Sequence, residues 1–302
     1  MKNKKEGADM AFRIDTAGAG FGSALLLVSI TSTQVGSSFA KFLFELVGPE
    51  AAVALRLLTS TLMLFAVLRP WRHVPKGGEW KSVALYGLSI AVMNASFYQA
   101  ISRIPLGIAV AIEFSGPLLV AAGSSRRFSD YAAVALAAAG LLTLMPWAGV
   151  NADLDMTGVF FAALAAVFWG TYIVVGRRAG TQAGASASAW GGLIGTLAAL
   201  PWALWMTGGV LIPAPALADA LPLAFLVGFA ASALPYGLEI VSLRLVPPQV
   251  FGVLMSIEPA VAALFGFLLL GEALSFSQWA AIGMVIAASL LVTLGQRKGQ
   301  NS

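Results

Sequence analysis

The sequence predicts an all-α integral membrane protein of ten transmembrane helices, arranged as two inverted five-helix repeats with both termini in the cytoplasm. Three observations predict this fold class: the apolar composition, the placement of basic residues in the connections, and an internal similarity between the two halves. Of the 302 residues, 59% are hydrophobic and 11% are charged, whereas a soluble domain carries about 25% charged residues. Most of the chain therefore cannot face water.

Ten apolar segments remain when the sequence is divided at charges, prolines and glycines. A spanning helix needs ~20 apolar residues, and each segment approaches or exceeds that length. Their expected limits are 21–41, 49–68, 82–101, 105–124, 130–148, 156–176, 185–206, 220–241, 247–270 and 276–295. The connections are short, so no domain outside the membrane is expected. The expected organisation is a cytoplasmic tail (1–20), a first repeat (21–148), a second, inverted repeat (156–295) and a cytoplasmic tail (296–302).

The distribution of basic residues predicts the orientation. With the N-terminus inside, 15 of the 18 Lys and Arg residues fall on the cytoplasmic side, which is the bias that the positive-inside rule describes. Lys41 and Arg103 fall outside, and Arg56 lies within the second span. Asp153 and Asp219 lie in the opposite loops. Because a missed span would scramble this alternation, the bias also supports the count of ten.

The two halves are similar at a constant offset. The stretch "PLGIAVAIEFSGP" aligns without gaps with "PPQVFGVLMSIEP", which pairs Pro105 with Pro247 and Pro117 with Pro259. Each half holds five spans, and because five is odd, the second half is inserted upside down. Inverted repeats of this kind are typical of secondary transporters, whose substrate site lies near the midplane between the halves.

Two glutamates, Glu113 and Glu258, lie inside these otherwise apolar stretches. A charge at mid-bilayer costs ~2.5–3.5 kcal/mol on the insertion scale, and Pro117 also lacks the amide that would bond the carbonyl of residue 113. Such groups persist at that depth only when buried in protein or lining a wet cavity, so an aqueous pathway is expected. Three interpretations stay open: contact with substrate or proton, protonated carboxyls that tie broken helices together, and side chains that line the cavity without contacting the substrate.

Four stretches make the sequence resemble the drug/metabolite transporter superfamily, EamA type. They are "SSFAKFLFELVGPEAAVALRL", "PLGIAVAIEFSGPLLVAAGSSRR", "ALPYGLEIVSLRLVP" and "FGVLMSIEPAVAALFGFLLLGEAL". The resemblance implies a ten-helix, multi-pass exporter in the bacterial inner membrane that moves amino acids, threonine, homoserine and other neutral ones, by alternating access. An aromatic amino-acid exporter or a broader metabolite or organic-anion carrier of the same superfamily is the alternative.

Polar and aromatic residues within the spans are the candidates for the substrate site. Carriers meet an ammonium with carbonyls or carboxylates, and a carboxylate with helix N-termini or a buried cation. The predicted substrate-binding residues are Asn94, Tyr98, Glu113, Trp169, Tyr236 and Glu258, with Gln34, Gln99, Trp190 and Glu239 as further candidates. Arg56 is either the partner of the substrate carboxylate or a structural residue. Helix breaks are expected at Pro117, Pro235 and Pro259.

Other function classes find little support in the sequence. The chain has no cysteine, which excludes thiol catalysis and thiolate metal sites, and no metal or other cofactor is expected. The only histidine, His73, falls in a cytoplasmic loop, so no zinc-protease motif or intramembrane Ser–His pair can form. A channel or a small scaffold remains as a minor alternative. The expected partners are small amino-acid substrates and the lipid bilayer, without nucleic acid; a monomer is compatible with the sequence.

Overall fold

The computed structural model is helical throughout the residues that it describes, which are 2–123, 128–143, 154–184, 186–245 and 254–300. No strand occurs in these ranges, and the prediction of an all-α protein is confirmed. Asp153 and Pro247 lie outside the described residues.

The helices follow one another through short connections. Their bounds are α1 (Lys2–Leu68), η1 (Pro70–Arg72), α2 (Glu79–Ile101), α3 (Leu106–Glu113), α4 (Ser115–Gly123), α5 (Phe128–Thr143), α6 (Met156–Ala183), α7 (Ser186–Met206), η3 (Ala214–Ala216), α8 (Leu217–Gly228), the π-helical turn η4 (Phe229–Ala233), α9 (Leu234–Leu245), α11 (Glu258–Leu270) and α12 (Phe276–Gln300). In the described part of the chain, four helical stretches are long and apolar enough to cross a membrane: Gly20–Leu68, Met156–Ala183, Ser186–Met206 and Ala214–Ala233.

The division into helices differs from the ten predicted spans, and the predicted count is not confirmed. The first two spans both lie in α1, in which two helices meet at a kink at Gly48, just before Pro49. Gly48 has φ +78°, a backbone conformation that glycine adopts without steric cost. The fourth span is divided into α3 and α4, and the eighth into α8, η4 and α9. Backbone hydrogen bonds, rather than hydrophobicity, decide these divisions.

The break predicted at Pro117 lies three residues earlier, at Phe114. Pro117 has no N–H to donate to the carbonyl of Glu113, so the turn opens on the N-terminal side of the proline. Pro259 lies in the first turn of α11, where a proline is readily accepted because the amide there has no helical partner. The break associated with Pro259 therefore also precedes it, and α11 begins at Glu258.

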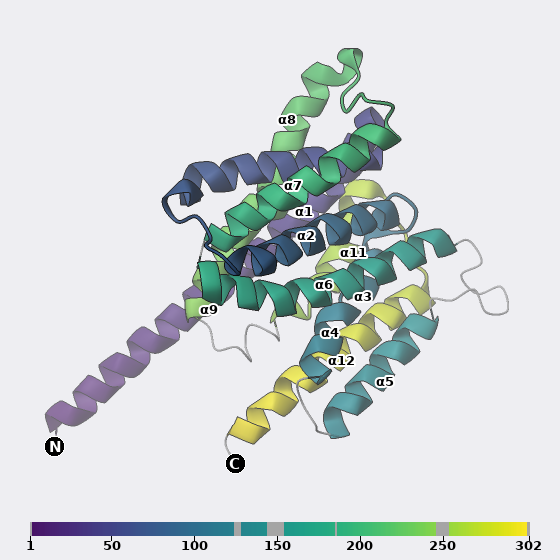
Figure 1. Cartoon of the computed structure of the whole chain (residues 1–302). Helices are drawn as coiled ribbons and strands as arrows, with labels where there is room; N and C mark the ends of the chain where they lie inside the picture. The colour runs from purple at the N-terminus through teal and green to yellow at the C-terminus, as the bar shows by residue number, and fades with distance from the viewer. Residues whose placement is uncertain (1, 124–127, 144–153, 185, 246–253, 301–302) are drawn as a thin grey trace.

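Helix pairs join the two halves of the sequence. α2 packs along α6 and α5 along α12, and Figure 1 shows the latter pair side by side. α3 packs against α11, and α1 contacts α7, α8 and α9. Most contacts between helices thus join an element before residue 144 to one after residue 153.

Small residues set the closest helix crossings. A Cβ added at Gly107 in α3 would lie 2.6 Å from the Cβ of Ala263 in α11. A Cβ added at Gly116 in α4 would lie 2.0 Å from the carbonyl oxygen of Ala166 in α6. Small residues that let backbones approach are the usual means of association in membrane helices. These two contacts hold the broken α3–α4 span against the second half of the chain.

The end of α11 carries a glutamate that joins three elements. Gly271 adopts φ +67° and closes the helix, and its N–H donates to the carbonyl of Phe267 at 3.2 Å, the hydrogen bond of an αL cap. The Glu272 carboxylate accepts the N–H of Leu106, at the start of α3, at 2.8 Å. Its other oxygen pairs with Lys41 of α1. The "GEAL" stretch thereby fixes α1, α3 and α11 relative to one another.

The start of α6 is defined by a side-chain cap. The Asp155 carboxylate accepts the N–H of Thr157 at 2.7 Å, which satisfies one of the free amides of the first turn. This hydrogen bond lowers the pKa of the Asp155 carboxyl, and the guanidinium of Arg103, with Nε at 3.9 Å, acts in the same direction. The predicted start of the sixth span, at 156, coincides with this cap.

Candidate substrate site

A π-helical turn creates unpaired backbone carbonyls in the middle of the bundle. In η4 the N–H of Leu234 donates to the carbonyl of Phe229, one residue further back than in an α-helix. Pro235 follows and has no N–H. It can therefore donate neither to the carbonyl of Ala231, its α-helical partner, nor to that of Ala230, its π-helical partner. The discontinuity predicted at Pro235 is thus found just before it.

Side chains of α1 provide the missing donors. Arg56 Nη2 donates to the carbonyl oxygen of Ala231 at 2.9 Å. The Ser32 hydroxyl donates to the carbonyl oxygen of Ala230 at 2.8 Å. Gly36 makes this approach feasible, because a Cβ there would lie 2.6 Å from the Ala231 nitrogen. Side chains of the first and second spans therefore donate hydrogen bonds to the carbonyls at the break in the eighth span.

Arg56 is the buried cation of this region. Its side chain is 5% exposed, its Nε donates to Ser232 Oγ at 3.0 Å, and its guanidinium carbon lies 5.3 Å from the centre of the Tyr98 ring. That geometry is a cation–π contact. Among the described side chains, no carboxylate forms an ion pair with it within 4.0 Å. Two N–H groups of Arg56 therefore link α1 to η4. The guanidinium has further N–H donors that these two hydrogen bonds do not use.

Glu258 and Gln34 form a half-satisfied polar pair. Gln34 Nε2 donates to Glu258 Oε1 at 3.0 Å across 224 positions of sequence. Glu258 Oε2 and Gln34 Oε1 are both buried and have no hydrogen-bond partner within the described part of the protein. Most buried polar atoms in proteins are hydrogen-bonded, so each exception needs an explanation. Two free acceptors on one pair indicate a place for a donor group that is not part of the chain.

Glu113 lies in the same interior region. Its side chain is 8% exposed, and no described residue gives it a hydrogen bond. The carboxyl interacts electrostatically with both Glu258 and Arg56. Next to it, the Phe114 ring packs edge-on against Trp169 of α6, with centroids 5.7 Å apart. The structure thus assembles two carboxyls and one guanidinium from α1, α3 and α11.

Other predicted candidates find partners elsewhere. Asn94 Nδ2 donates to the carbonyl of Ile90 within its own helix, at 2.8 Å. Gln99 Nε2 donates to Glu50 Oε1 at 2.7 Å. The Trp190 ring packs edge-on against the rings of Phe65 and Trp80. The Glu239 carboxylate accepts a hydrogen bond from the Ser29 hydroxyl at 2.9 Å. The side chain of Tyr236 lies outside the described residues.

Ser232 and Ser32 are the participants that sequence reasoning missed. Both are small hydroxyl residues in apolar spans, and a hydroxyl alone is a weak signal because it can bond its own helix. One sequence signal does exist for Ser232, which precedes Pro235 by three positions. A polar side chain that close to an intramembrane proline is placed to meet the groups that the break leaves unpaired.

Comparisons with known proteins agree with this architecture. Residues 156–294 match the EamA-like transporter family. Over 274 residues the chain is 43% identical to the threonine/homoserine exporter RhtA of Escherichia coli strain K12, covering 91% of this chain and 92% of that protein. The RhtA of Salmonella typhimurium strain LT2 is 42% identical over the same shares. The inner membrane transporter YedA of Escherichia coli strain K12, described as uncharacterized, is 27% identical over 82% of each chain.

One solved crystal structure superimposes on most of the molecule. The TM-score is 0.57 at 19% sequence identity, and the match covers 93% of this chain and 99% of the other. At that identity the likeness shows a shared fold alone.

Proposed function

The chain belongs to the EamA-like transporter family, and on that basis we propose that it is a secondary transporter exporting threonine, homoserine and other neutral amino acids. It is a transporter rather than an enzyme, and a multi-pass protein of the bacterial inner membrane. The observation that carries the substrate class is the 43% identity to a threonine/homoserine exporter over 91% of the chain.

The polar cluster around Arg56 is the proposed midplane site. The substrate ammonium donates to the free acceptors of Glu258 and Gln34 and to the carboxyl of Glu113. The substrate carboxylate accepts from the guanidinium N–H groups of Arg56 that the helix break does not use. Tyr98 and Trp169 form apolar walls for the side chain. Support for this arrangement comes from the unpaired acceptors beside a buried cation.

Asn94 and Tyr236 are proposed to extend the lining of this space. Asn94 lies one helical turn before Tyr98 on α2, so both side chains share a face. Tyr236 directly follows Pro235 in α9. The amide of Asn94 offers hydrogen-bond capacity for the hydroxyl of threonine or homoserine.

Alternating access is the proposed mechanism, with ten spans in two inverted repeats, 21–148 and 156–295. The proposed repeat relates the third span to the eighth, and the sixth span to the first. The pair α2–α6 has its counterpart in the contacts of α1 with α8 and α9. The fourth and ninth spans (α3 with α11) and the fifth and tenth (α5 with α12) pair with each other. Each of these helix contacts therefore has a counterpart when the two repeats are interchanged. This symmetry supports a mechanism in which the two halves move about one central site.

The orientation can be tested by cysteine labelling, because the chain has no cysteine of its own. We expect Asp219→Cys to react with a membrane-impermeant maleimide added outside intact cells. Arg177→Cys should react only after the membrane is opened, since the basic loops lie inside. Labelling of Arg177→Cys from outside, or of both positions from one side, would contradict the inverted repeat.

Transport can be tested with purified protein in liposomes. Internal unlabelled threonine is expected to accelerate uptake of labelled threonine, and the uptake should saturate, as a carrier requires. Homoserine and larger neutral amino acids should compete within about 200-fold, because added methylenes change binding by ~1–3 kcal/mol. Protein-free liposomes are the control. Transport of phosphate esters or organic acids without amino-acid counterflow would favour the alternative carrier class.

A further inference from the structure

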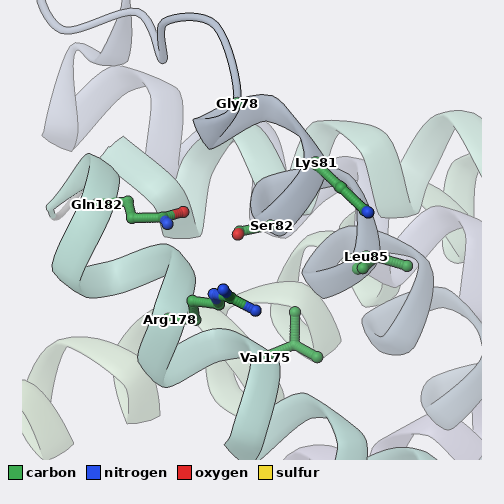
Figure 2. A pocket seen from close by; sticks show the side chains of 7 residues that line it. All are labelled: Gly78, Lys81, Ser82, Leu85, Val175, Arg178 and Gln182. Atoms are coloured by element: carbon green, nitrogen blue, oxygen red, sulfur yellow. The ribbon is translucent and has the colours of Figure 1, made fainter.

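A second polar site lies away from the cluster around Arg56, where α2 begins and α6 ends. Figure 2 shows Lys81, Ser82, Arg178 and Gln182 around a cavity of about 190 Å³ between the two helices. Pockets for whole small-molecule ligands usually span ~300–1,000 Å³. The cavity is therefore of a size for one polar headgroup.

The charges of this cavity are not neutralised by the protein. The side-chain cations of Lys81 and Arg178 form no ion pair or hydrogen bond with any residue that the structure describes. The nearest acidic residue in sequence, Glu79, does not line the cavity; its carboxylate accepts the N–H of Lys76 at 2.8 Å. Two unpaired cations on facing helices favour a bound anion.

Ser82 is an independent indication of a ligand. Its side chain is 7% exposed, its hydroxyl points into the cavity in Figure 2, and no described residue hydrogen-bonds to it. A hydroxyl without a protein partner is available to donate to a group bound in the cavity. Ser82 also lies in the first turn of α2, where the helix dipole and free amides favour negative charge.

The cavity continues into an apolar surface. Leu85 and Val175 line its inner side. Leu88, seven residues after Lys81, is 46% exposed. Val174, four residues before Arg178, is 58% exposed. At these spacings each apolar side chain shares a helix face with its cation. An anion in the cavity would thus lie at the head of an apolar strip, which suits an amphipathic molecule.

We propose that this site binds the phosphate headgroup of an anionic glycerophospholipid from the cytoplasmic leaflet, with an acyl chain along Leu85, Leu88 and Val174. By the positive-inside rule this end of α2 and α6 faces the cytoplasm, and basic pockets between helices at that depth bind anionic headgroups. Because α2 and α6 belong to different proposed repeats, the lipid bridges the two halves.

The test uses the purified full-length protein in detergent, with native mass spectrometry counting bound lipid. The probes are dioleoyl phosphatidylglycerol, dioleoyl phosphatidylcholine with the same acyl chains, and inorganic phosphate as competitor. The protein should retain phosphatidylglycerol in preference to phosphatidylcholine. The double variant Lys81→Gln/Arg178→Gln should bind phosphatidylglycerol roughly thirtyfold more weakly at low salt, given the worth of two interfacial cations.

The matched control is Arg72→Gln/Lys76→Gln, which removes two exposed charges from the neighbouring loop but none from the cavity. It should bind phosphatidylglycerol as the wild type does, and Ser82→Ala should weaken binding by a smaller factor than the double variant. The melting temperature without lipid checks that every variant is folded. Equal weakening in the control, equal binding of phosphatidylcholine, or displacement by inorganic phosphate at the lipid's own concentration would each overturn the lipid site.

Discussion

Replacing Glu258 with glutamine is expected to reduce threonine export in the liposome assay at least tenfold, while folding stays near wild type. Gln34 can still donate to the remaining oxygen of residue 258, so the contact between α1 and α11 is kept. The unpaired acceptor, however, becomes an N–H₂ donor and the ionisable group is lost. An ammonium that donated to a carboxylate there would lose a charged hydrogen bond, worth ~1.5–3 kcal/mol.

The matched control for Glu258→Gln is Glu239→Gln. Glu239 is also a carboxyl inside the bundle, but it already accepts a hydrogen bond from Ser29, which the glutamine oxygen can equally accept. Export by Glu239→Gln should therefore remain near wild type. Equal loss in both variants would point to general damage rather than a role of the free oxygen.

The structural interpretation of the glutamates predicts a different pattern. If the carboxyls only tie broken helices together, replacing either glutamate with glutamine leaves export nearly unchanged. Replacing it with alanine destabilises the fold by ~1–3 kcal/mol, because its buried hydrogen-bonding partners are left unpaired. Full export by both Glu258→Gln and Glu113→Gln would reject coupling or ammonium binding by either residue.

Gly116→Ala is expected to be the most destabilising single methyl addition in the described part of the chain. The added Cβ would lie 2.0 Å from the carbonyl oxygen of Ala166 and 2.8 Å from its carbonyl carbon. Because the obstacle is backbone, no rotamer change relieves it, and α4 must move away from α6. Overpacking costs 1–3 kcal/mol or more, so we expect about 3 kcal/mol and a melting temperature in detergent that falls by several degrees.

The control for that variant is Gly283→Ala. Gly283 lies within α12, and an added Cβ meets nothing within 4 Å. Alanine favours a helix over glycine by ~0.8–1 kcal/mol, so this variant should be as stable as the wild type or slightly more so. If Gly116→Ala melts no lower than Gly283→Ala, α4 and α6 do not approach as closely as described.

Features with local causes were predictable from the sequence. Proline lacks an N–H wherever it stands, so the discontinuities near Pro117, Pro235 and Pro259 could be expected, although each break lies on the N-terminal side of its proline. The connection predicted between the first two spans, residues 42–48, contains Gly48, where the backbone leaves the helical conformation.

The type of a polar residue and its position within a span did not predict its hydrogen-bonding partner. A buried amide in mid-span must find a partner, but Asn94 finds it four residues back, at the carbonyl of Ile90, in its own helix. Gln34 instead reaches a residue 224 positions away. Both side chains are amides in apolar surroundings, so their sequence contexts do not distinguish them. Which face of the helix each occupies, and what that face contacts, decides the outcome.

The sequence by itself determined the membrane environment, the predicted orientation and the identity of the few ionisable groups within the spans. These follow from burial energies that each segment experiences on its own, whichever neighbours it has. Only the tertiary structure decided that Arg56 supports the carbonyl of Ala231, freed by Pro235, and that Glu258 keeps one oxygen unpaired. Those facts depend on contacts between helices far apart in sequence, and small residues such as Gly36 allow the backbones to approach closely enough to make them.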